Sequence, residues 1–170
     1  KDLSAVLTMT GAAHVRVRAL NFQWAQHAGI VCERCDSVEI AGNHLLNTLL
    51  GGHDQSGQGS KIVASKNARI HHNVIHGWWT GMGFYRSQGT IIENNTILDT
   101  AQTGITVGDD SKGSRITYNS INYSGNHALE FTVQDLDYSD YMIDYNNYGT
   151  SFQPRARSLA DADTILPRTY

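Results

Sequence analysis

The fold is decided by the segments Ala68-Arg-Ile70-His-His-Asn73-Val-Ile75, Thr90-Ile-Ile92-Glu-Asn-Asn95-Thr-Ile97 and Ser114-Arg-Ile116-Thr-Tyr-Asn119-Ser-Ile121. All three follow one pattern: an apolar residue, two variable residues, an asparagine, one variable residue and a second apolar residue. Self-similarity of this kind is the sequence signature of repeat architectures. The chain is therefore expected to be built from repeated structural units.

The repeat extends outward in both directions from these segments. Ile40-Ala-Gly-Asn43-His-Leu45 follows the same pattern, and Val17 to Phe22 and Ile143 to Tyr148 are weaker members. The first apolar positions fall at 17, 40, 70, 92, 116 and 143, with separations of 23, 30, 22, 24 and 27 residues. A period of this size matches one turn of a β-solenoid.

A second motif recurs in each repeat and predicts a strand. Its members are Gly29-Ile30-Val31-Cys32, Gly81-Met82-Gly83-Phe84, Gly104-Ile105-Thr106-Val107 and His127-Ala128-Leu129-Glu130-Phe131. Alternation of apolar and variable residues is typical of a half-buried strand. In the longest repeat the matching position is Gly59-Ser60-Lys61-Ile62, so residues 44–58 are expected as an inserted loop.

Stacking of the repeats predicts columns of like residues. Inward-facing columns are expected at Ile30, Ser60, Met82, Ile105 and Leu129, at Cys32, Ile62, Phe84, Val107 and Phe131, and at Phe22, Leu45, Ile75, Ile97 and Ile121. Five asparagines would share one turn, where their amides can satisfy backbone groups that the strand ladders leave free. These are Asn43, Asn73, Asn95, Asn119 and Asn146.

This pattern resembles the right-handed parallel β-helix proteins of the pectate-lyase-like superfamily. The resemblance implies an all-β solenoid of about six coils with an asparagine ladder, and the handedness comes from the resemblance. Residues 1–170 are expected to form a single domain, with the repeat over about 13–150 and a C-terminal extension over 151–170. We expect the chain to be part of a longer one, because no capping helix is evident at either end.

Charge and apolar content exclude some classes of partner. Thirteen Lys and Arg stand against 16 Asp and Glu, for a net charge of -3. No global basic field exists to hold nucleic acid, and the apolar runs are too short for membrane insertion. The resemblance implies a secreted or periplasmic protein whose partner is a polysaccharide or glycan.

Candidate binding residues gather on one outer face. In related enzymes the substrate lies along the strand that carries the second motif. The outward positions and ends of these strands bring Lys61, Tyr85, Arg86, Asp109 and Glu130 to one face, with Trp78 and Trp79 just before it. Aromatic rings beside charged groups suit sugars. The small Gly81 and Gly83 are expected to leave open surface for a ligand.

One catalytic hypothesis is a polysaccharide lyase. Ser65-Lys66-Asn67 and Arg86-Ser87-Gln88 are similar to segments of lyases resembling chondroitinase B, and they stand 20 residues apart here. Lys66, or His53 from the inserted loop, would remove the proton α to a uronate carboxylate, and Arg86 and Lys61 would stabilise the resulting charge. The calcium-binding carboxylates of those lyases are not seen near Lys61, so no cofactor is expected.

Two other enzymatic hypotheses and one without catalysis remain open. Gly51-Gly-His53-Asp54 is similar to part of the Asp-Pro-His-Asp motif of mannuronan epimerases. In a glycoside hydrolase, Asp109 and Glu130 would form the carboxylate pair, with Cα atoms roughly 11 Å apart from strand geometry. The non-catalytic alternative is a glycan-binding, adhesive or structural module. An inserted loop folded toward Lys61 and Arg86 would favour catalysis.

The cysteines and clustered histidines have simpler interpretations. Cys32 and Cys35 form a Cys-x-x-Cys segment without a second pair to complete a zinc site. Cys32 is expected as a small buried residue, and its redox state stays open. His71 and His72 are expected on opposite faces of a strand, which favours structural or solvated roles for them and for His76 over metal binding.

Overall fold

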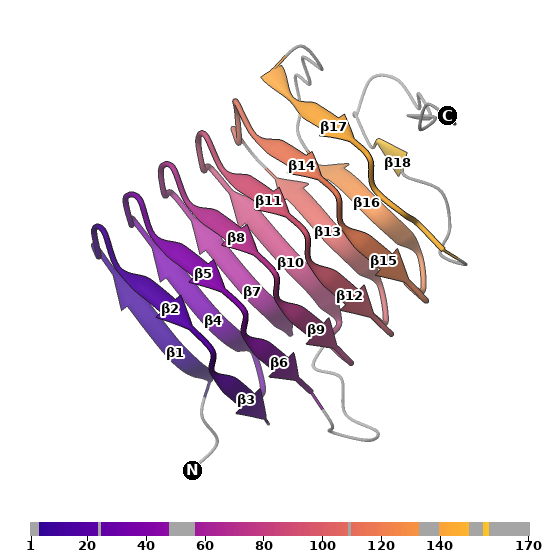
Figure 1. Ribbon diagram of the computed structural model, residues 1–170, viewed down its shortest axis with the longest axis horizontal. Coiled ribbons are helices and arrows are strands. Elements are labelled where there is room, and N and C mark those ends of the chain that lie inside the picture. The colour runs from indigo at the N-terminus through magenta and orange to yellow at the C-terminus, as the bar shows by residue number, and fades with distance from the viewer. Residues whose placement is uncertain are drawn as a thin grey trace.

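The computed structural model describes residues 4–23, 25–47, 57–108, 110–132, 140–149 and 155–156. Its strands stack as three parallel sheets that wind around a common core (Figure 1). Within the described residues, β1 to β15 make five complete turns of three strands each, and β16 and β17 begin a sixth. The expected parallel β-helix is confirmed, with slightly fewer complete coils than the six expected.

Each turn contains one six-residue strand and two three-residue strands. The six-residue strands, with β18, form the first sheet: β1 (Ala5–Thr10), β4 (Ala28–Glu33), β7 (Gln58–Val63), β10 (Thr80–Tyr85), β13 (Thr103–Gly108), β16 (His127–Thr132) and β18 (Arg155–Ala156). The second sheet contains β2 (Arg16–Arg18), β5 (Glu39–Ala41), β8 (Arg69–His71), β11 (Ile91–Glu93), β14 (Arg115–Thr117) and β17 (Met142–Asp144). The third contains β3 (Asn21–Gln23), β6 (His44–Leu46), β9 (Val74–His76), β12 (Thr96–Leu98) and β15 (Ser120–Asn122).

The core consists of the predicted columns. Ile30, Ser60, Met82, Ile105 and Leu129 are register partners along the first sheet, and so are the residues of the column that contains Cys32. The column from Phe22 to Ile121 runs through the third sheet. Nearly all of these side chains are at most 1% exposed. Because every coil buries the same positions, the apolar contacts extend without a break through the solenoid.

The asparagine ladder is confirmed as a continuous chain of hydrogen bonds. Asn43 Nδ2 donates to Asn73 Oδ1 at 3.0 Å, and the same contact repeats from Asn73 to Asn95, from Asn95 to Asn119 and from Asn119 to Asn146. Each acceptor oxygen also receives the backbone N–H of the preceding asparagine. The ladder thus satisfies buried turn groups that have no partner in a strand.

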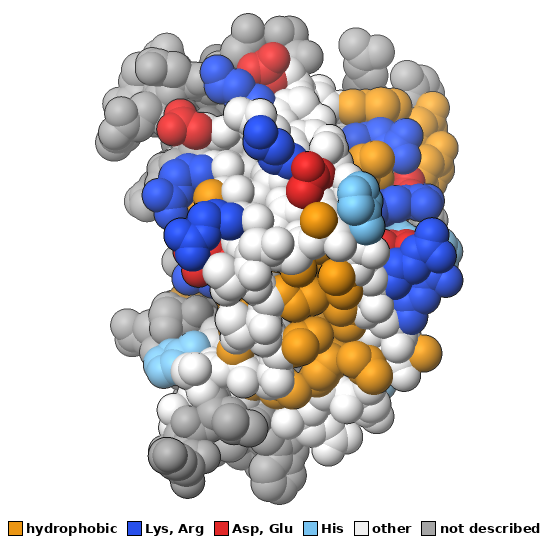
Figure 2. All heavy atoms as spheres, turned by 90° about the vertical axis from the view of Figure 1, so that its left-hand side faces the viewer, with side chains coloured by type: hydrophobic (Ala, Val, Ile, Leu, Met, Phe, Trp, Pro, Cys, Tyr) orange, Lys and Arg blue, Asp and Glu red, His pale blue; other side chains and the backbone are white. Residues whose placement is uncertain are grey.

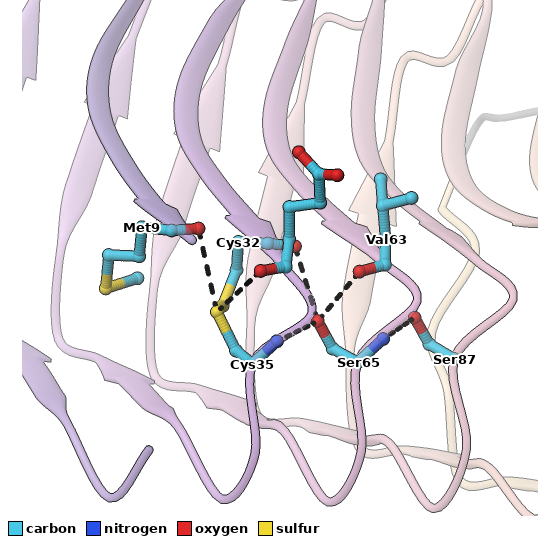
Figure 3. Close-up of a disulfide and its surroundings, with 7 residues drawn as sticks. Met9, Cys32, Cys35, Val63, Ser65 and Ser87 are labelled. Carbon is cyan, nitrogen blue, oxygen red and sulfur yellow. Dashed lines mark hydrogen bonds between the residues drawn. A yellow bond between two sulfur atoms is a disulfide. The ribbon is translucent and has the colours of Figure 1, made fainter. Parts of the chain in front are cut away.

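A second, shorter ladder lies at the turn after the long strands. The backbone N–H of Cys35 donates to Ser65 Oγ at 3.0 Å, and the N–H of Ser65 donates in the same way to Ser87 Oγ (Figure 3). The N–H of Ser87 continues the ladder by donating to Ser111 Oγ. Cys35 is joined by a disulfide to Cys32, which is fully buried as expected. The disulfide therefore closes the turn at the first position of this serine ladder.

Chain reversals between the sheets use left-handed backbone conformations. Gly11, Arg34, Ala64 and Arg86 have φ between 50° and 64° and occupy the same corner of successive coils. Left-handed conformation costs little for glycine but about 1–2 kcal/mol for other residues. Since non-glycine residues hold many of these corners, the packing and ladders on either side must fix them.

The repeat begins earlier than expected, because β1 already pairs with β4. Seen from this end, hydrophobic side chains gather at the centre of the face, with charged side chains toward the flanks (Figure 2). The first coil contributes Val6, Leu7, Met9 and Ala12, which pack against the core and stay partly exposed.

Candidate functional site

A groove of about 770 Å³ lies on the outer face of the first sheet, over β1, β4, β7 and β10. Its size falls within the roughly 300–1,000 Å³ typical of ligand pockets. Aliphatic side chains such as Val31 and Val63 contribute to the lining. The lining also contains six long polar or charged side chains: His27, Glu33, Gln58, Lys61, Tyr85 and Arg86.

Strand register brings the three expected residues Lys61, Tyr85 and Arg86 together in this groove. Lys61 points outward from β7 between its register partners Val31 and Gly83. Tyr85 is the last residue of β10, and Arg86 follows it at a corner with φ of 52°. Side chains from different coils therefore converge because parallel stacking places them about one strand spacing apart, ~4.8 Å.

The cations of the groove differ from the other described arginines. Arg16, Arg18, Arg34, Arg69 and Arg115 each pair with a glutamate. Lys61 and Arg86, in contrast, make no side-chain ion pair or hydrogen bond within the described part of the chain. Two cations that make no ion pair with another described residue thus share one concave surface, which favours an anionic ligand.

Tyr85 lies across the outer surface of two glycines. A Cβ added at Gly83 would be 2.7 Å from the Tyr85 hydroxyl oxygen, and one added at Gly108 would collide with the ring. Gln58 Nε2 donates to the same hydroxyl at 2.9 Å. The sequence predicted that Gly83 leaves open surface for a ligand. This prediction is wrong, because the Tyr85 ring covers Gly83. Gly81 is equally unavailable, since its Cβ position meets Gly104 O and Ile97.

Lys66 does not belong to the groove, which corrects its expected place as the base. The chain turns through Ala64 and the buried Ser65, and Lys66 then lies exposed at the turn into β8, bridged to Asp36 and Gln88. Glu130 shares the outer face but lies three strands from Lys61, outside the groove lining, where its Oε2 accepts from Thr103 Oγ1 at 3.2 Å.

The two tryptophans also lie away from the groove. Trp78 is 1% exposed, and its Nε1 donates to Leu45 O at 3.0 Å within the core. The expectation that it offers an aromatic surface to sugars is wrong, because the ring fills space inside the third turn. Trp79 is half-buried and donates to Gln102 Oε1. The expected residues His53, Asp54 and Asp109 lie outside the described residues.

Sequence reasoning missed His27 and Gln58 as groove residues. Gln58 is the register partner of Ala28 at the start of β7, three positions before Lys61. Strict alternation would place Gln58 inward with Ser60 and Ile62, because three positions separate it from the outward Lys61. The alternation is interrupted at Gly59, whose Cβ position faces Ile75 and Trp78 in the core, and Gln58 therefore turns outward. His27 directly precedes β4, where periodicity does not specify which way a side chain points.

The second sheet carries an ion-pair network in place of a groove. Hydrogen bonds from Arg18 and His71 lower the pKa of Glu39 to about 2. Burial of Glu93 opposes its ionisation, but the hydrogen bond and charge of Arg69 outweigh burial and lower its pKa. These carboxylates hold the arginines of this face in compensated pairs.

The histidines pair rather than gather around a metal position. His71 Nδ1 and His72 Nδ1 are 2.8 Å apart, although alternation predicted opposite faces, because His72 occupies a left-handed corner. His76 Nε2 lies 2.6 Å from Asp99 Oδ2. Over the described residues, no three His, Cys, Asp or Glu side chains are grouped so as to hold a metal ion.

The family of the chain follows from a comparison with protein families. The family of right-handed β-helix regions matches residues 5–152, and the chain belongs to it. A comparison with curated proteins found no match. No helix in the described part of the chain is long and apolar enough to cross a membrane. Membership in this family is compatible with carbohydrate-active or carbohydrate-binding roles.

Proposed function

We propose that the protein binds an acidic polysaccharide in the groove on the outer face of the first sheet. The observation that carries this proposal is the pair of cations on one concave surface, Lys61 and Arg86, neither of which pairs with a carboxylate among the described residues. A guanidinium offers a planar fork of donors that matches a carboxylate. Gln58 and Tyr85 add polar and aromatic groups of the kind that bind sugar hydroxyls and sugar faces.

A polysaccharide is favoured over other polyanions by the shape and charge of the molecule. The groove is open and crosses four strands, so an extended chain can lie in it without being enclosed. The net charge of -3 provides no global basic field of the kind that holds nucleic acid. We further propose an extracellular or periplasmic location, which the Cys32–Cys35 disulfide supports because disulfides persist in oxidising compartments.

The test is binding of the parent protein to a panel of polyuronates, sulfated glycans and neutral glucans, measured by calorimetry. Acidic glycans should bind and neutral glucans should not. The variant Lys61→Gln/Arg86→Gln should lose this binding, while Arg16→Gln, which removes an exposed arginine from the second sheet, should keep it. Equal binding of neutral and acidic glycans would exclude the proposal.

A second candidate function is β-elimination on the same bound chain, and it is favoured by His27 and Lys61, which both line the groove. A base removes the proton at C5 of a uronate, and the electron pair shifts into the carboxylate that Arg86 neutralises. The C4–O bond then breaks, and the leaving oxygen takes up a proton. The products are an unsaturated uronide and a new chain end.

Lyase activity and binding alone give different results with one substrate. A lyase produces ultraviolet absorbance from the new C4–C5 double bond, and His27→Ala should slow its appearance if His27 is the base. Tight binding of a polyuronate without any such absorbance over a wide pH range would assign the groove to binding alone.

A further inference from the structure

Tyr85 occupies an unusual position on the outer face of the first sheet. One edge of its ring contacts Gly83 on its own strand, and the other contacts Gly108 on β13. A Cβ at Gly83 would lie 2.8 Å from ring carbon Cε2, and one at Gly108 would lie 2.7 Å from Cε1. Because any larger residue would displace the ring, the two glycines form a shelf on which the ring rests.

The ring is held in place from the groove side as well. Gln58 Nε2 donates to the Tyr85 hydroxyl at 2.9 Å from the neighbouring strand β7. Tyr85 is half-buried, and its side chain belongs to the groove lining. The shelf and the hydrogen bond fix the ring before any ligand arrives, so binding costs little side-chain entropy.

The two cations of the groove are neighbours of this ring. Lys61 is the register partner of Gly83, on which the hydroxyl edge rests, and Arg86 follows Tyr85 directly. On the other side of Gly83 its register partner is Thr106 on β13, and the next partner in that row is Glu130 on β16. An aromatic surface flanked by cations on the groove side suits a ligand that is flat, apolar on one face and negatively charged at its edge.

We infer that Tyr85 is the stacking platform for one uronic acid residue, and that Gly83 and Gly108 are positioning residues for it. The inference rests on the proposed binding of an acidic polysaccharide and names the part of that ligand which Tyr85 recognises. The apolar face of the pyranose covers the ring, and the carboxylate at its edge meets Arg86 or Lys61. A polyanion without sugar rings contacts Lys61 and Arg86 but gains nothing from the Tyr85 ring.

The test compares two kinds of anion on matched variants by calorimetry. The sugar probes are hexagalacturonate and hexamannuronate, and the probe without rings is hexaglutamate. Tyr85→Ala should raise the Kd of the sugar probe that binds the parent by roughly 3- to 10-fold, the scale of an aromatic contact, and should leave the Kd of hexaglutamate unchanged. Tyr85→Phe should retain most of the affinity, because the shelf still supports the ring. Gly108→Ala should weaken sugar binding as Tyr85→Ala does, although every groove side chain is still present.

Tyr123→Ala is the matched control, since Tyr123 is 63% exposed on another part of the solenoid, and circular dichroism establishes that each variant folds. Unchanged sugar affinity in Tyr85→Ala overturns the platform and leaves the proposed function standing. Equal loss for the sugar probe and hexaglutamate also overturns it, because Tyr85 would then act through the cations. If no acidic sugar binds the parent, the proposed function fails and the platform fails with it.

Discussion

Asn73 gives both its backbone N–H and its side-chain Nδ2 to a single atom, Asn95 Oδ1, at 3.0 and 2.9 Å. Asn95 in turn donates from Nδ2 to Ile70 O and to Asn119 Oδ1. All three asparagines are 1% exposed, so water cannot replace a lost partner. Each amide in the ladder therefore satisfies buried groups in the coils on both sides of it.

Asn95→Ala should lower the free energy of unfolding by about 2–4 kcal/mol. The substitution leaves the buried Asn73 N–H without an acceptor and removes a donor from the Ile70 carbonyl, and an unsatisfied buried group costs about 1–3 kcal/mol. Denaturant unfolding followed by circular dichroism measures the loss. Asn146→Ala is the control, because Asn146 is more exposed and is the last asparagine of the ladder, where its Nδ2 donates to Ile116 O. A loss for Asn95→Ala no larger than for Asn146→Ala would contradict this account of the ladder.

Removing the disulfide should cost only about 2 kcal/mol, because it closes a very short loop. The choice of replacement should matter as much as the loss of the bond. Cys35 stands in register with Ser65, Ser87 and Ser111 of the serine ladder. Cys32→Ala/Cys35→Ser should therefore be more stable than Cys32→Ala/Cys35→Ala in denaturant unfolding, since a hydroxyl can bond at this turn. Equal stability of the two variants would show that the ladder ends at Ser65.

The fold could be predicted from the sequence because the contacts between coils of a solenoid recur at a nearly constant interval along the chain. Residues that contact each other across coils, such as Ile70 and Ile92, occupy the same position in successive repeats. One motif therefore predicts many contacts. The serine ladder carried the same signal: Ser65, Ser87 and Ser111 each stand five residues before Ile70, Ile92 and Ile116. It was missed because serine is common in turns and the apolar pattern does not depend on it.

The candidate site was only partly predictable, for a related reason. Outward positions such as Lys61 and Tyr85 follow from strand alternation and were found. Residues at the turns do not follow from it, because a left-handed corner redirects the chain. Lys66 and Trp78 lie beyond such corners, and the structure places one at an outer turn and the other in the core. The contact of the Tyr85 ring with Gly83 and Gly108 could not be predicted from the sequence. Two glycines predict an open space on the sheet but not which side chain fills it.

Glu39→Gln should make stability less sensitive to acid. Hydrogen bonds from Arg18 and His71 depress the pKa of Glu39 from 4.5 to about 2 in the folded protein. Its ionised form therefore stabilises the fold above pH 4.5, and this contribution is lost as the pH falls toward about 2. The difference in Tm between the parent and Glu39→Gln should be largest near neutral pH and vanish below this window.

The control for the acid response is Glu33→Gln. Glu33 has a more exposed side chain and makes one contact, at 3.4 Å, with Arg34. Its substitution should leave the pH profile of Tm close to that of the parent. A difference between Glu39→Gln and the parent that stays constant across the window would mean that the network on the second sheet does not hold Glu39 ionised.

Arg86→Lys should weaken binding of an acidic glycan by about 1–3 kcal/mol, the scale of a hydrogen bond between charged groups. Lysine keeps the charge but cannot copy the planar fork with which arginine meets a carboxylate. Stability should change by less than about 0.5 kcal/mol, because the side chain is exposed and both residues tolerate the same corner.

Arg34→Lys provides a matched control. The φ of Arg34 is 53° against 52° for Arg86, it holds the same corner of an earlier coil, and it already pairs with Glu33. Calorimetry on both variants should show a loss for Arg86→Lys alone. Equal affinities would mean that Arg86 contributes only its charge, and equal losses would place the anion-binding surface along the whole row of corners rather than in the groove.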